Sequence, residues 1–479
     1  MTDPAFPDLF INGLFVPALD GRRFETIDPA TEEPIAQVAR GGAADIDAAV
    51  KAAEAARHGP WGETTPAERG RMLMALADLV LAHREELAVL ETRDVGKPLG
   101  GSRGDIDGVA ETLRYNAGAA DKIHGEVIPL GPRFVDFTML EPVGVTAHIV
   151  PWNFPLGMAL RSLAPALAAG CTAVVKPAEQ SPLSSLHFCQ LLEKAGIPPG
   201  VVNVVTGFGE EAGASLVAHA DVRAVHFTGS VETGRIVAVA AARSFKPVVL
   251  ELGGKNAMIV LADADLDRAV ESALEGGFDN CGQVCSASSR FLVHRDVVGA
   301  FTARLVARVS ALSIGPGMEN PDLGPLVSAE QLAKVMAHIH AAQSAGVHLL
   351  TGGHRPKNLH RGYFIAPAVF ANVDPSLPIA REEVFGPVVT ITPISSDGEA
   401  VEIANSVSTG LVAGVHTSDI SRALSIVRRL QTGSVWVNGW YMGGVQAPTG
   451  GEKDSGLGRE RGIAGIRNFL RIKNVAIRL

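Results

Sequence analysis

Two cysteines four positions apart are the first candidates for chemistry in this sequence. Cys281 and Cys285 lie in the stretch GFDNCGQVCSASSR, and the chain of 479 residues contains only four cysteines. The pair could form a disulfide, share a metal ion, or consist of one reactive sulfur beside an inert neighbour. A nucleophilic cysteine must be a thiolate that the substrate can reach. Small residues flank Cys285 and leave its backbone N–H free to donate, whereas Cys281 has a bulkier setting.

The expected cellular compartment and the spacing of the cysteines help to choose between a disulfide, a metal site and a single reactive sulfur. The N-terminal stretch MTDPAFPDLF lacks the basic and apolar regions of a signal peptide, and no apolar run approaches the roughly 18–20 residues of a membrane span. We therefore expect a soluble, cytoplasmic protein whose cysteines stay reduced. No CxxC or Cys/His cluster provides metal-ligand spacing around Cys285, so we expect no metal. The spacing also fits two small buried side chains on successive helical turns.

Two further side chains could serve a reaction at a carbonyl carbon. Attack by a thiolate creates a negative oxygen that needs hydrogen-bond donors. Asn153 follows the run VGVTAHIV and stands between Pro151 and Pro155, so its amide could be such a donor or could complete a turn. Glu251 ends the apolar run of VVLELGG, where a carboxylate is costly unless it is paired, titrated or facing a cavity. It is the candidate general base.

Signals for a dinucleotide cofactor are weaker. The glycine fingerprint G-x-G-x-x-G after a strand is missing. Gly229 and Gly234 in FTGSVETG flank a strand-to-helix turn whose N–H groups could bind one phosphate, but an ordinary turn explains them equally well. Lys176 and Glu179 end the run TAVVKPAE and would suit two hydroxyls of a ribose, with two surface charges as the alternative.

The elements that must position these residues alternate between strands and helices. Helical spacing of apolar residues covers 45–59 and 66–96, and Gly96 and Pro98 would end the second helix. Strand-like runs follow at 143–150, 172–179, 201–207, 223–230, 247–254, 256–260, 290–297, 368–373, 387–394 and 433–438. A helix is expected near 328–345, among the later of these runs. Such alternation predicts mostly parallel sheets. Because one core rarely serves more than about 250–300 residues, we expect two α/β units that meet near 251–254.

The overall charge indicates which partners to expect. The 42 basic and 51 acidic residues give a net charge of −9, and no Lys/Arg cluster stands out along the chain. A polyanion such as DNA or RNA is bound mainly through clustered cations. We therefore expect no nucleic acid and no membrane partner, and a small molecule as the substrate.

Seven stretches together resemble the aldehyde dehydrogenase superfamily over nearly the whole chain. They occur in the family's order and at its approximate spacing: PWNFPL, KPAEQSP, FTGSVETG, LELGGKNAMIV, GQVCSASSR, REEVFGPV and PTGGEKDSGLGRERG. The resemblance implies that Cys285 attacks the aldehyde and that Asn153 and the Cys285 N–H hold the oxyanion. Hydride leaves for NAD(P)⁺, and Glu251 activates the water that hydrolyses the thioester to a carboxylic acid.

The resemblance also implies a cofactor site in a variant Rossmann-like fold, which makes few phosphate contacts. Its cofactor-binding residues would be Trp152, Lys176, Glu179, Gly229, Ser230, Glu383 and Phe385. Lys176 and Glu179 would hold the adenosine ribose, and Ser230 a phosphate. The Glu179 carboxylate would repel a 2′-phosphate, so NAD is favoured, with NADP as a second option.

By the same resemblance, the chain has three functional parts. An NAD-binding domain would comprise 1–122 and 142–253, and a catalytic α/β domain 254–447. A small β-hairpin oligomerisation arm at 123–141 would join the C-terminal strand region 465–479, where pairing across subunits covers an open strand edge. The resemblance thus implies a homodimer or homotetramer.

The substrate is the least defined part of this prediction. Arg161 lies eight residues after Asn153, where an arginine occurs in some semialdehyde and some aromatic-aldehyde dehydrogenases, or it could pair with a nearby acid. Phe154 and Trp440 are further candidates for shaping the substrate tunnel, with packing as the alternative. Two other functions remain as alternatives, a CoA-acylating dehydrogenase and a non-catalytic protein that reuses the fold. The presence of Glu251 argues against the first, and Cys285 with Asn153 against the second.

Overall fold

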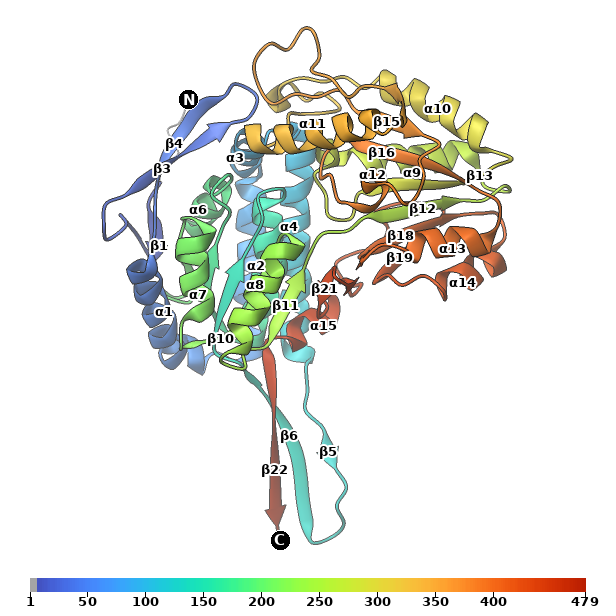
Figure 1. Ribbon diagram of the computed structural model, residues 1–479. Coiled ribbons are helices and arrows are strands. Elements are labelled where there is room, and N and C mark those ends of the chain that lie inside the picture. Colours follow the sequence, from blue (N-terminus) through green and yellow to red (C-terminus); the bar gives the residue numbers. More distant parts are fainter. Residues whose placement is uncertain (1–6) are drawn as a thin grey trace.

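The structure, a computed structural model, describes residues 7–479 and contains two large β-sheets that lie side by side (Figure 1). Their strands and helices alternate along the chain, so the predicted α/β fold is confirmed. The cytoplasmic location was predicted from the N-terminal stretch MTDPAFPDLF, and residues 1–6 of this stretch lie outside the described residues. Within residues 7–479, no helix is both long enough and apolar enough to cross a membrane.

The first sheet has eight strands in the order β2-β1-β9-β8-β7-β10-β11-β21. Its five central strands are parallel, and β1 and β21 pair antiparallel with them on either side. Every residue of β7 and β8 is buried, as expected for a parallel sheet covered on both faces. The strands are β1 (Leu9–Ile11), β2 (Leu14–Val16), β7 (Val145–Ile149), β8 (Thr172–Lys176), β9 (Val202–Val204), β10 (Val222–Thr228), β11 (Val248–Glu251) and β21 (Gly456–Leu457).

Two groups of helices cover the two faces of this sheet. Successive side chains of β8 alternate between them, because Ala173 and Val175 pack with one group and Val174 with the other. The first group is α2 (Pro66–Ala82), α3 (Arg84–Val95), α4 (Leu99–Ala119), α5 (Pro155–Ala169) and α6 (Leu183–Cys189). The second group is α1 (Ala43–His58), α7 (Ala214–Ala218) and α8 (Val231–Ala242).

The helix predicted over 66–96 is two helices in the structure. His83, with φ −102° and ψ 18°, ends α2 and begins α3. The apolar spacing could not reveal this break, because Leu76 of α2 and Leu87 of α3 belong to the same hydrophobic cluster. Gly96 does end α3, in the left-handed conformation (φ 87°) that a glycine adopts without strain.

The second sheet has seven strands in the order β14-β15-β16-β13-β12-β18-β19, parallel except for β14. The strands are β12 (Asn256–Val260), β13 (Ser288–His294), β14 (His348–Thr351), β15 (Ala368–Ala371), β16 (Val388–Ile394), β18 (Val412–His416) and β19 (Ser434–Val437). Its helices are α9 (Leu266–Phe278), α10 (Val298–Ser310), α11 (Ala329–Ser344), α12 (Pro378–Arg381), α13 (Asp397–Asn405) and α14 (Ile420–Val427). α9 and α10 share a hydrophobic cluster on one face, and α13 and α14 share another on the opposite face.

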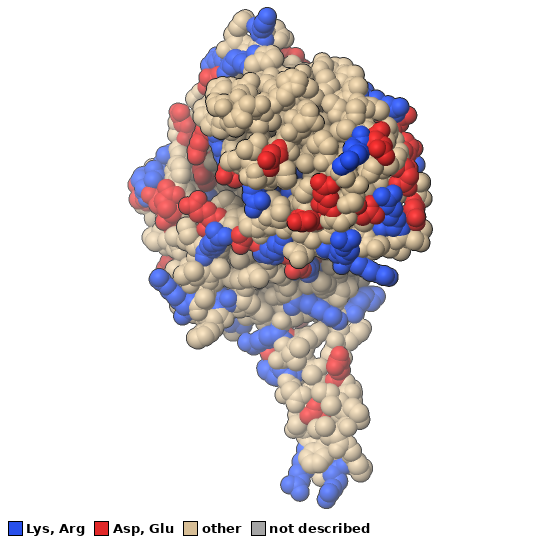
Figure 2. Space-filling view, turned by 45° about the vertical axis from the view of Figure 1, so that its right-hand side comes forward, with Lys and Arg blue, Asp and Glu red and all other residues tan. Residues whose placement is uncertain are grey.

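A three-stranded antiparallel sheet projects from the body (Figure 1). It consists of β5 (Val127–Ile128), β6 (Phe134–Pro142) and β22 (Leu470–Arg478), and β22 pairs with β6 along its whole length. The outer edge of β22 has no strand partner within residues 7–479. In Figure 2 this projecting arm has basic side chains at its tip and a few acidic ones along its length, whereas acidic and basic side chains intermingle over the body.

Short elements complete the chain. They are the strand pairs β3 (Arg23–Asp28) with β4 (Glu33–Ala39) and β17 (Thr409–Gly410) with β20 (Glu452–Lys453), and the helix α15 (Gly462–Arg467). Although β21 and α15 are close to the C-terminus in sequence, β21 pairs with β11 and α15 packs against α5. The C-terminal segment thereby returns to the first sheet, beside the strand that ends at Glu251.

Candidate active site

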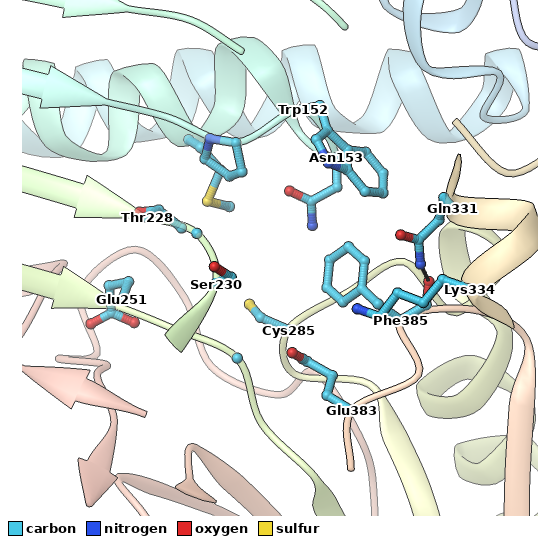
Figure 3. Close-up of a pocket in the computed structure, with 14 residues that line it drawn as sticks. Trp152, Asn153, Thr228, Ser230, Glu251, Cys285, Gln331, Lys334, Glu383 and Phe385 are labelled. Atoms are coloured by element: carbon cyan, nitrogen blue, oxygen red, sulfur yellow. Dashed lines mark hydrogen bonds between the residues drawn. The ribbon is translucent and has the colours of Figure 1, made fainter. Parts of the chain in front are cut away.

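Three neighbouring cavities lie beyond the carboxyl ends of the first sheet's strands, the edge where α/β sheets bind ligands. The wide cavity, of about 830 Å³, contains Lys176 and Glu179. The central cavity, of about 200 Å³, shares Trp152, Ser230 and three other residues with the wide one (Figure 3). The small cavity, of about 150 Å³, lies on the other side of the central one. Cys285 and Glu251 are the two residues that line both the central and the small cavity.

Cys285 lies on the loop between α9 and β13, half-buried and facing these two cavities. Its carbonyl oxygen accepts a hydrogen bond of 2.8 Å from the side chain of Asn256. Among residues 7–479 its backbone N–H has no acceptor, so it is free to donate into a cavity. Burial raises the pKa of the Cys285 thiol to about 11, against the opposing effect of Arg161. The thiol is therefore protonated at neutral pH and must lose its proton before it can attack.

Cys281 has different surroundings, although it is only four residues away. Its side chain is buried among apolar residues that include Leu326 and Val335, and burial raises the pKa of its thiol to about 12. Asn280, Cys281 and Gly282 all have positive φ angles (45°, 58° and 69°), so the cysteines do not lie on successive turns of a regular helix. All four cysteines are free thiols, which rules out the disulfide alternative in this structure.

Asn153 lies between β7 and α5 and is bound to the loop that carries Cys285. Its Nδ2 donates to the carbonyl oxygen of Gln283 (2.9 Å), and the Asn280 amide donates to the Asn153 carbonyl oxygen (3.1 Å). One hydrogen of the Asn153 amide nitrogen is thus engaged and the second remains available. Figure 3 shows the amide directed into the central cavity on the same side as Cys285.

Glu251 ends β11, and its carboxylate is buried at the junction of the two cavities. Its Oε1 has no hydrogen-bond partner within residues 7–479. Gly450 comes so close that a Cβ there would lie 3.0 Å from this oxygen, so the C-terminal segment covers the carboxylate. Burial, followed by the negative charge of Glu460, raises the pKa of Glu251 to about 8. Such a group can take up and release a proton near neutral pH.

The residues predicted to bind a cofactor all line the wide or the central cavity. In the wide cavity, Lys176 Nζ donates to Glu179 Oε2 at 2.9 Å, which orders a cation and an anion side by side. Ser230 caps the first turn of α8 by accepting from the Thr233 N–H (3.2 Å). Gly229 lies directly before this cap and lines both cavities.

The remaining predicted cofactor residues meet in the central cavity. Phe385 and Trp152 contact edge to face, with ring centroids 5.3 Å apart. Glu383 accepts a hydrogen bond from the Gly254 N–H (3.0 Å), and partial burial raises its pKa to about 7. A Cβ at Gly253 would lie 2.0 Å from the Glu383 carboxylate, so only glycine permits this approach.

Among the residues of the central cavity that sequence reasoning missed are Gln331 and Lys334, both on α11. Gln331 Nε2 donates to the carbonyl oxygen of Phe385 (2.7 Å) and so supports a residue whose φ is +55°. No local motif marks these positions. Only the packing of α11 over the segment that contains Phe385 brings them to the cavity (Figure 3).

Arg161 lines the small cavity and also forms a buried ion pair. Its Nε contacts Glu460 Oε2, and the other oxygen of Glu460 lies 2.6 Å from His226 Nε2. Burial alone would raise the pKa of Glu460, but Arg161 and then His226 lower it to about 2. The sequence left open whether Arg161 contacts the substrate or pairs with an acid. In the structure Arg161 pairs with Glu460 and also lines the small cavity.

Phe154 and Trp440, the other two candidates for substrate contact, are not among the residues that line the three cavities. The ring of Phe154 packs under Lys97 Nζ at 3.9 Å. Trp440 is buried, and its indole N–H donates to the carbonyl oxygen of Ser286, next to Cys285 (3.1 Å). The part of the chain around and after Trp440 lines the small cavity with other residues: Trp436, Tyr441, Met442, Thr449 and Arg461.

The sequence matches known proteins over nearly its whole length. The model of the Aldehyde dehydrogenase family matches residues 15–475. An aldehyde dehydrogenase of Emericella nidulans is 45% identical over 473 residues, which cover 98% of this chain and 95% of that protein. The mitochondrial aldehyde dehydrogenase of Equus caballus is also 45% identical, over 483 residues that cover 99% of this chain and 96% of that protein.

A solved structure agrees in fold as well as in sequence. The NAD⁺ complex of aldehyde dehydrogenase from Bacillus cereus has a TM-score of 0.97 to this chain at 45% identity. The aligned region covers 98% of this chain and 96% of that one.

Proposed function

This chain belongs to the aldehyde dehydrogenase family, and from that premise we propose that Cys285, Asn153 and Glu251 carry out the oxidation of an aldehyde to its carboxylic acid. The observation that carries this assignment is the position of Cys285 and Glu251 at the junction of the central and small cavities. NAD⁺ is the cofactor, and when bound it supplies the acceptor for the hydride. An aldehyde bound in the small cavity and the cofactor bound in the central cavity would then lie on the two sides of the Cys285 thiol.

In the first half-reaction the Cys285 thiol gives its proton to water, and the thiolate attacks the carbonyl carbon. A C–S bond forms while the π electron pair of the carbonyl moves to the oxygen, which becomes an oxyanion. The free hydrogen of the Asn153 amide and the free Cys285 N–H both border this point and can donate to that oxygen. Such donors stabilise the charge that develops in the transition state. Return of the electron pair from oxygen expels the hydride and leaves a thioester on Cys285.

In the second half-reaction Glu251 takes a proton from a water molecule that attacks the thioester. The C–S bond then breaks, and the carboxylic acid and the free Cys285 sulfur are released. Glu251 is suited to this step because its Oε1 has no competing partner and its pKa of about 8 makes it a stronger base than an ordinary carboxylate. Gly450 limits access to it from the C-terminal side.

The wide and central cavities fit a dinucleotide with an unmodified adenosine ribose. The adjacent Lys176 ammonium and Glu179 carboxylate can donate to one ribose hydroxyl and accept from the other. Ser230 and the N-terminal turn of α8 would face a phosphate, and Glu383 would accept from the second ribose. With Glu179 in this place, a 2′-phosphate would meet a negative charge, which favours NAD over NADP.

Glu179→Ser is therefore expected to shift cofactor preference towards NADP. Removal of the carboxylate ends the repulsion and frees Lys176 for a phosphate, so the ratio of kcat/KM for NADP to that for NAD should rise by about tenfold or more. Steady-state kinetics with both cofactors measure this ratio. Glu210→Ser is the matched control, because Glu210 also lines the wide cavity but has no ion pair with Lys176. An unchanged ratio in Glu179→Ser would contradict this assignment of the ribose site.

The small cavity favours an aldehyde that carries a carboxylate. Arg161 and Arg461 both line it, and Arg161 is paired with the buried Glu460. Glu251, whose pKa is raised to about 8, is the acid that lines the cavity beside them. The Arg461 side chain forms no hydrogen bond or ion pair within residues 7–479, although the negative charges of Glu460 and Glu251 act on it, so its guanidinium can still contact an anionic group. We propose a short semialdehyde with a terminal carboxylate as the substrate class, in preference to an aromatic aldehyde.

A panel of aldehydes tests both the activity and the substrate class. Formation of NADH is expected with short aldehydes, and kcat/KM should be about tenfold higher for a semialdehyde than for its uncharged methyl ester. Arg461→Gln should remove most of this advantage. Arg467→Gln, an equal loss of charge on the same segment but away from the cavities, should keep it. No NADH with any aldehyde would disprove the activity, whereas equal rates for acid and ester would disprove only the anionic substrate.

The domain boundaries, assembly and location are also proposals. The first sheet supports an NAD-binding domain of 1–122 and 142–253, and the second sheet a catalytic domain of 254–447. The arm, 123–141 with 465–479, has an open edge at β22 and exposed apolar side chains such as Ile472, which supports a homodimer or homotetramer. Four free thiols support a reducing, cytoplasmic location.

A further inference from the structure

Two histidines and a glutamate converge where α3 meets α6, outside the three cavities. His83 precedes α3, Glu86 is in its first turn, and His187 comes from α6, about one hundred residues later. His83 Nδ1 lies 2.9 Å and His187 Nε2 3.1 Å from the same carboxylate oxygen, Glu86 Oε2. All three potential ligand atoms lie within 4.8 Å of one another.

This set of atoms matches the preferences of a divalent transition metal. Imidazole nitrogen and carboxylate oxygen are ligands of Zn²⁺, at bond lengths of about 2.0–2.2 Å. In a tetrahedral site such ligands are about 3.3 Å apart, which small side-chain rotations can reach from the observed positions. The ion would bind the two ring nitrogens that now face Glu86, each ring would carry its proton on the other nitrogen, and water would complete the coordination.

The surroundings of the three side chains are compatible with a bound cation. The neighbouring charges of α3 are already paired, Arg84 with Asp107 and Glu85 with Arg103. Glu86 has no lysine or arginine partner among the described residues, so its charge is available to an ion. Lys194, near His187, is the cation that opposes binding.

Access and support are both present at this position. The Glu86 side chain is 60% exposed, whereas His83 and His187 are 29% and 20% exposed, so an ion could enter from solvent and meet two largely fixed rings. The Gln190 amide nitrogen lies 3.3 Å from His187 Nδ1. With this amide turned over, its oxygen would accept from Nδ1–H and leave Nε2 free for the metal. Partners of this kind orient a ligating histidine and fix its tautomer.

We propose that His83, Glu86 and His187 form a binding site for one divalent transition-metal ion, with Zn²⁺ as the best match. The ion would join two helices that are distant in sequence. α3 also carries Glu91, whose carboxylate accepts from the Leu156 N–H at the start of α5 (2.9 Å) and from Ser184 on α6 (3.2 Å). A metal at the site therefore adds a second link to an existing α3–α6 contact and should stabilise the folded state.

The test is a Zn²⁺ titration by isothermal calorimetry, together with thermal unfolding in the presence and absence of Zn²⁺. Cys285→Ala serves as the background, because the half-buried thiol could itself bind zinc, whereas the other three cysteines are buried. One Zn²⁺ per chain and a higher unfolding temperature are expected, with no effect of Mg²⁺, which prefers oxygen ligands.

Single substitutions then locate the ion. His83→Gln and His187→Gln, on two different elements, should each weaken Zn²⁺ binding by more than the roughly 10–100-fold that loss of an outer partner causes. His219→Gln is the matched control, since His219 contacts a single carboxylate, Asp47. The metal-free variants should unfold at the same temperature as the background. Absence of Zn²⁺ binding in the background, or unchanged affinity in both ligand variants, would overturn the proposal.

Discussion

Cys285→Ala should reduce aldehyde oxidation by about 10⁴-fold or more, because it removes the atom that forms the covalent bond to the substrate. The thiol is the one sulfur that faces both the central and the small cavity. Neither the Asn153 amide nor Glu251 can replace it, since they stabilise charge and transfer protons without attacking carbon. The measurement is the rate of NADH formation at saturating aldehyde and NAD⁺.

Cys281→Ala is the matched control for this prediction. Cys281 is buried in an apolar cluster with a thiol pKa of about 12, so it should contribute packing rather than chemistry. Its loss should lower the free energy of unfolding by about 1 kcal/mol and change kcat only slightly. Mass spectrometry with an aldehyde and NAD⁺ should detect an acyl adduct in Cys281→Ala and none in Cys285→Ala. An active Cys285→Ala protein would refute the proposed mechanism.

Glu251→Gln should separate the two half-reactions. An amide of nearly the same shape cannot accept a proton from water, so hydrolysis of the thioester should slow by about 10²–10⁴-fold. In the proposed mechanism hydride transfer does not use this carboxylate. Rapid mixing should therefore show a burst of about one NADH per active site followed by slow turnover, and the acyl-enzyme should accumulate.

The pH profile of the wild-type enzyme gives an independent measure of the same group. Glu251 is active as a base only when deprotonated, and burial together with Glu460 raises its pKa to about 8. The basic form thus increases as pH rises, and when hydrolysis limits the rate, kcat should increase between about pH 7 and about pH 9. In Glu251→Gln this increase should disappear from the slow phase.

A CoA-acylating enzyme would behave differently in this experiment. If CoA were the natural acceptor of the acyl group, Glu251→Gln with CoA would turn over at the wild-type rate and release a thioester of CoA. Continued slow turnover in the presence of CoA supports water as the acceptor. A Glu251→Gln protein without a burst, and with unchanged steady-state kcat, would remove Glu251 from the mechanism.

Much of the fold could be predicted because its signals are local. The fully buried strands β7 and β8 appear in the sequence as short runs rich in β-branched residues, and Gly96 ends α3 where the helical pattern stops. The break at His83 was missed because the apolar stripe continues across it into the same cluster. Periodicity records which side chains face the core, and it is insensitive to a bend that keeps the same face buried.

The candidate site shows the same division. Cys285, Asn153 and Glu251 could be named as candidates from their side-chain types and local settings, and the family resemblance then implied a role for each. Gln331 reaches the central cavity only through the packing of α11, and Glu460 reaches Arg161 from about three hundred residues away. The proposed metal ligands were missed for this reason too, since His187 is distant in sequence from His83 and Glu86.

The sequence by itself determined the fold class, the family and the chemical types of the reacting groups, because these depend on side-chain identity, strand and helix periodicity and the order of motifs. Only the tertiary structure decided which of two nearby sulfurs faces a cavity. Three consecutive left-handed residues, Asn280 to Gly282, place Cys281 in the core and Cys285 at the junction with Glu251. It also decided the protonation of Glu251 and the pairing of Arg161, because burial and charge interactions depend on distances in space rather than in sequence.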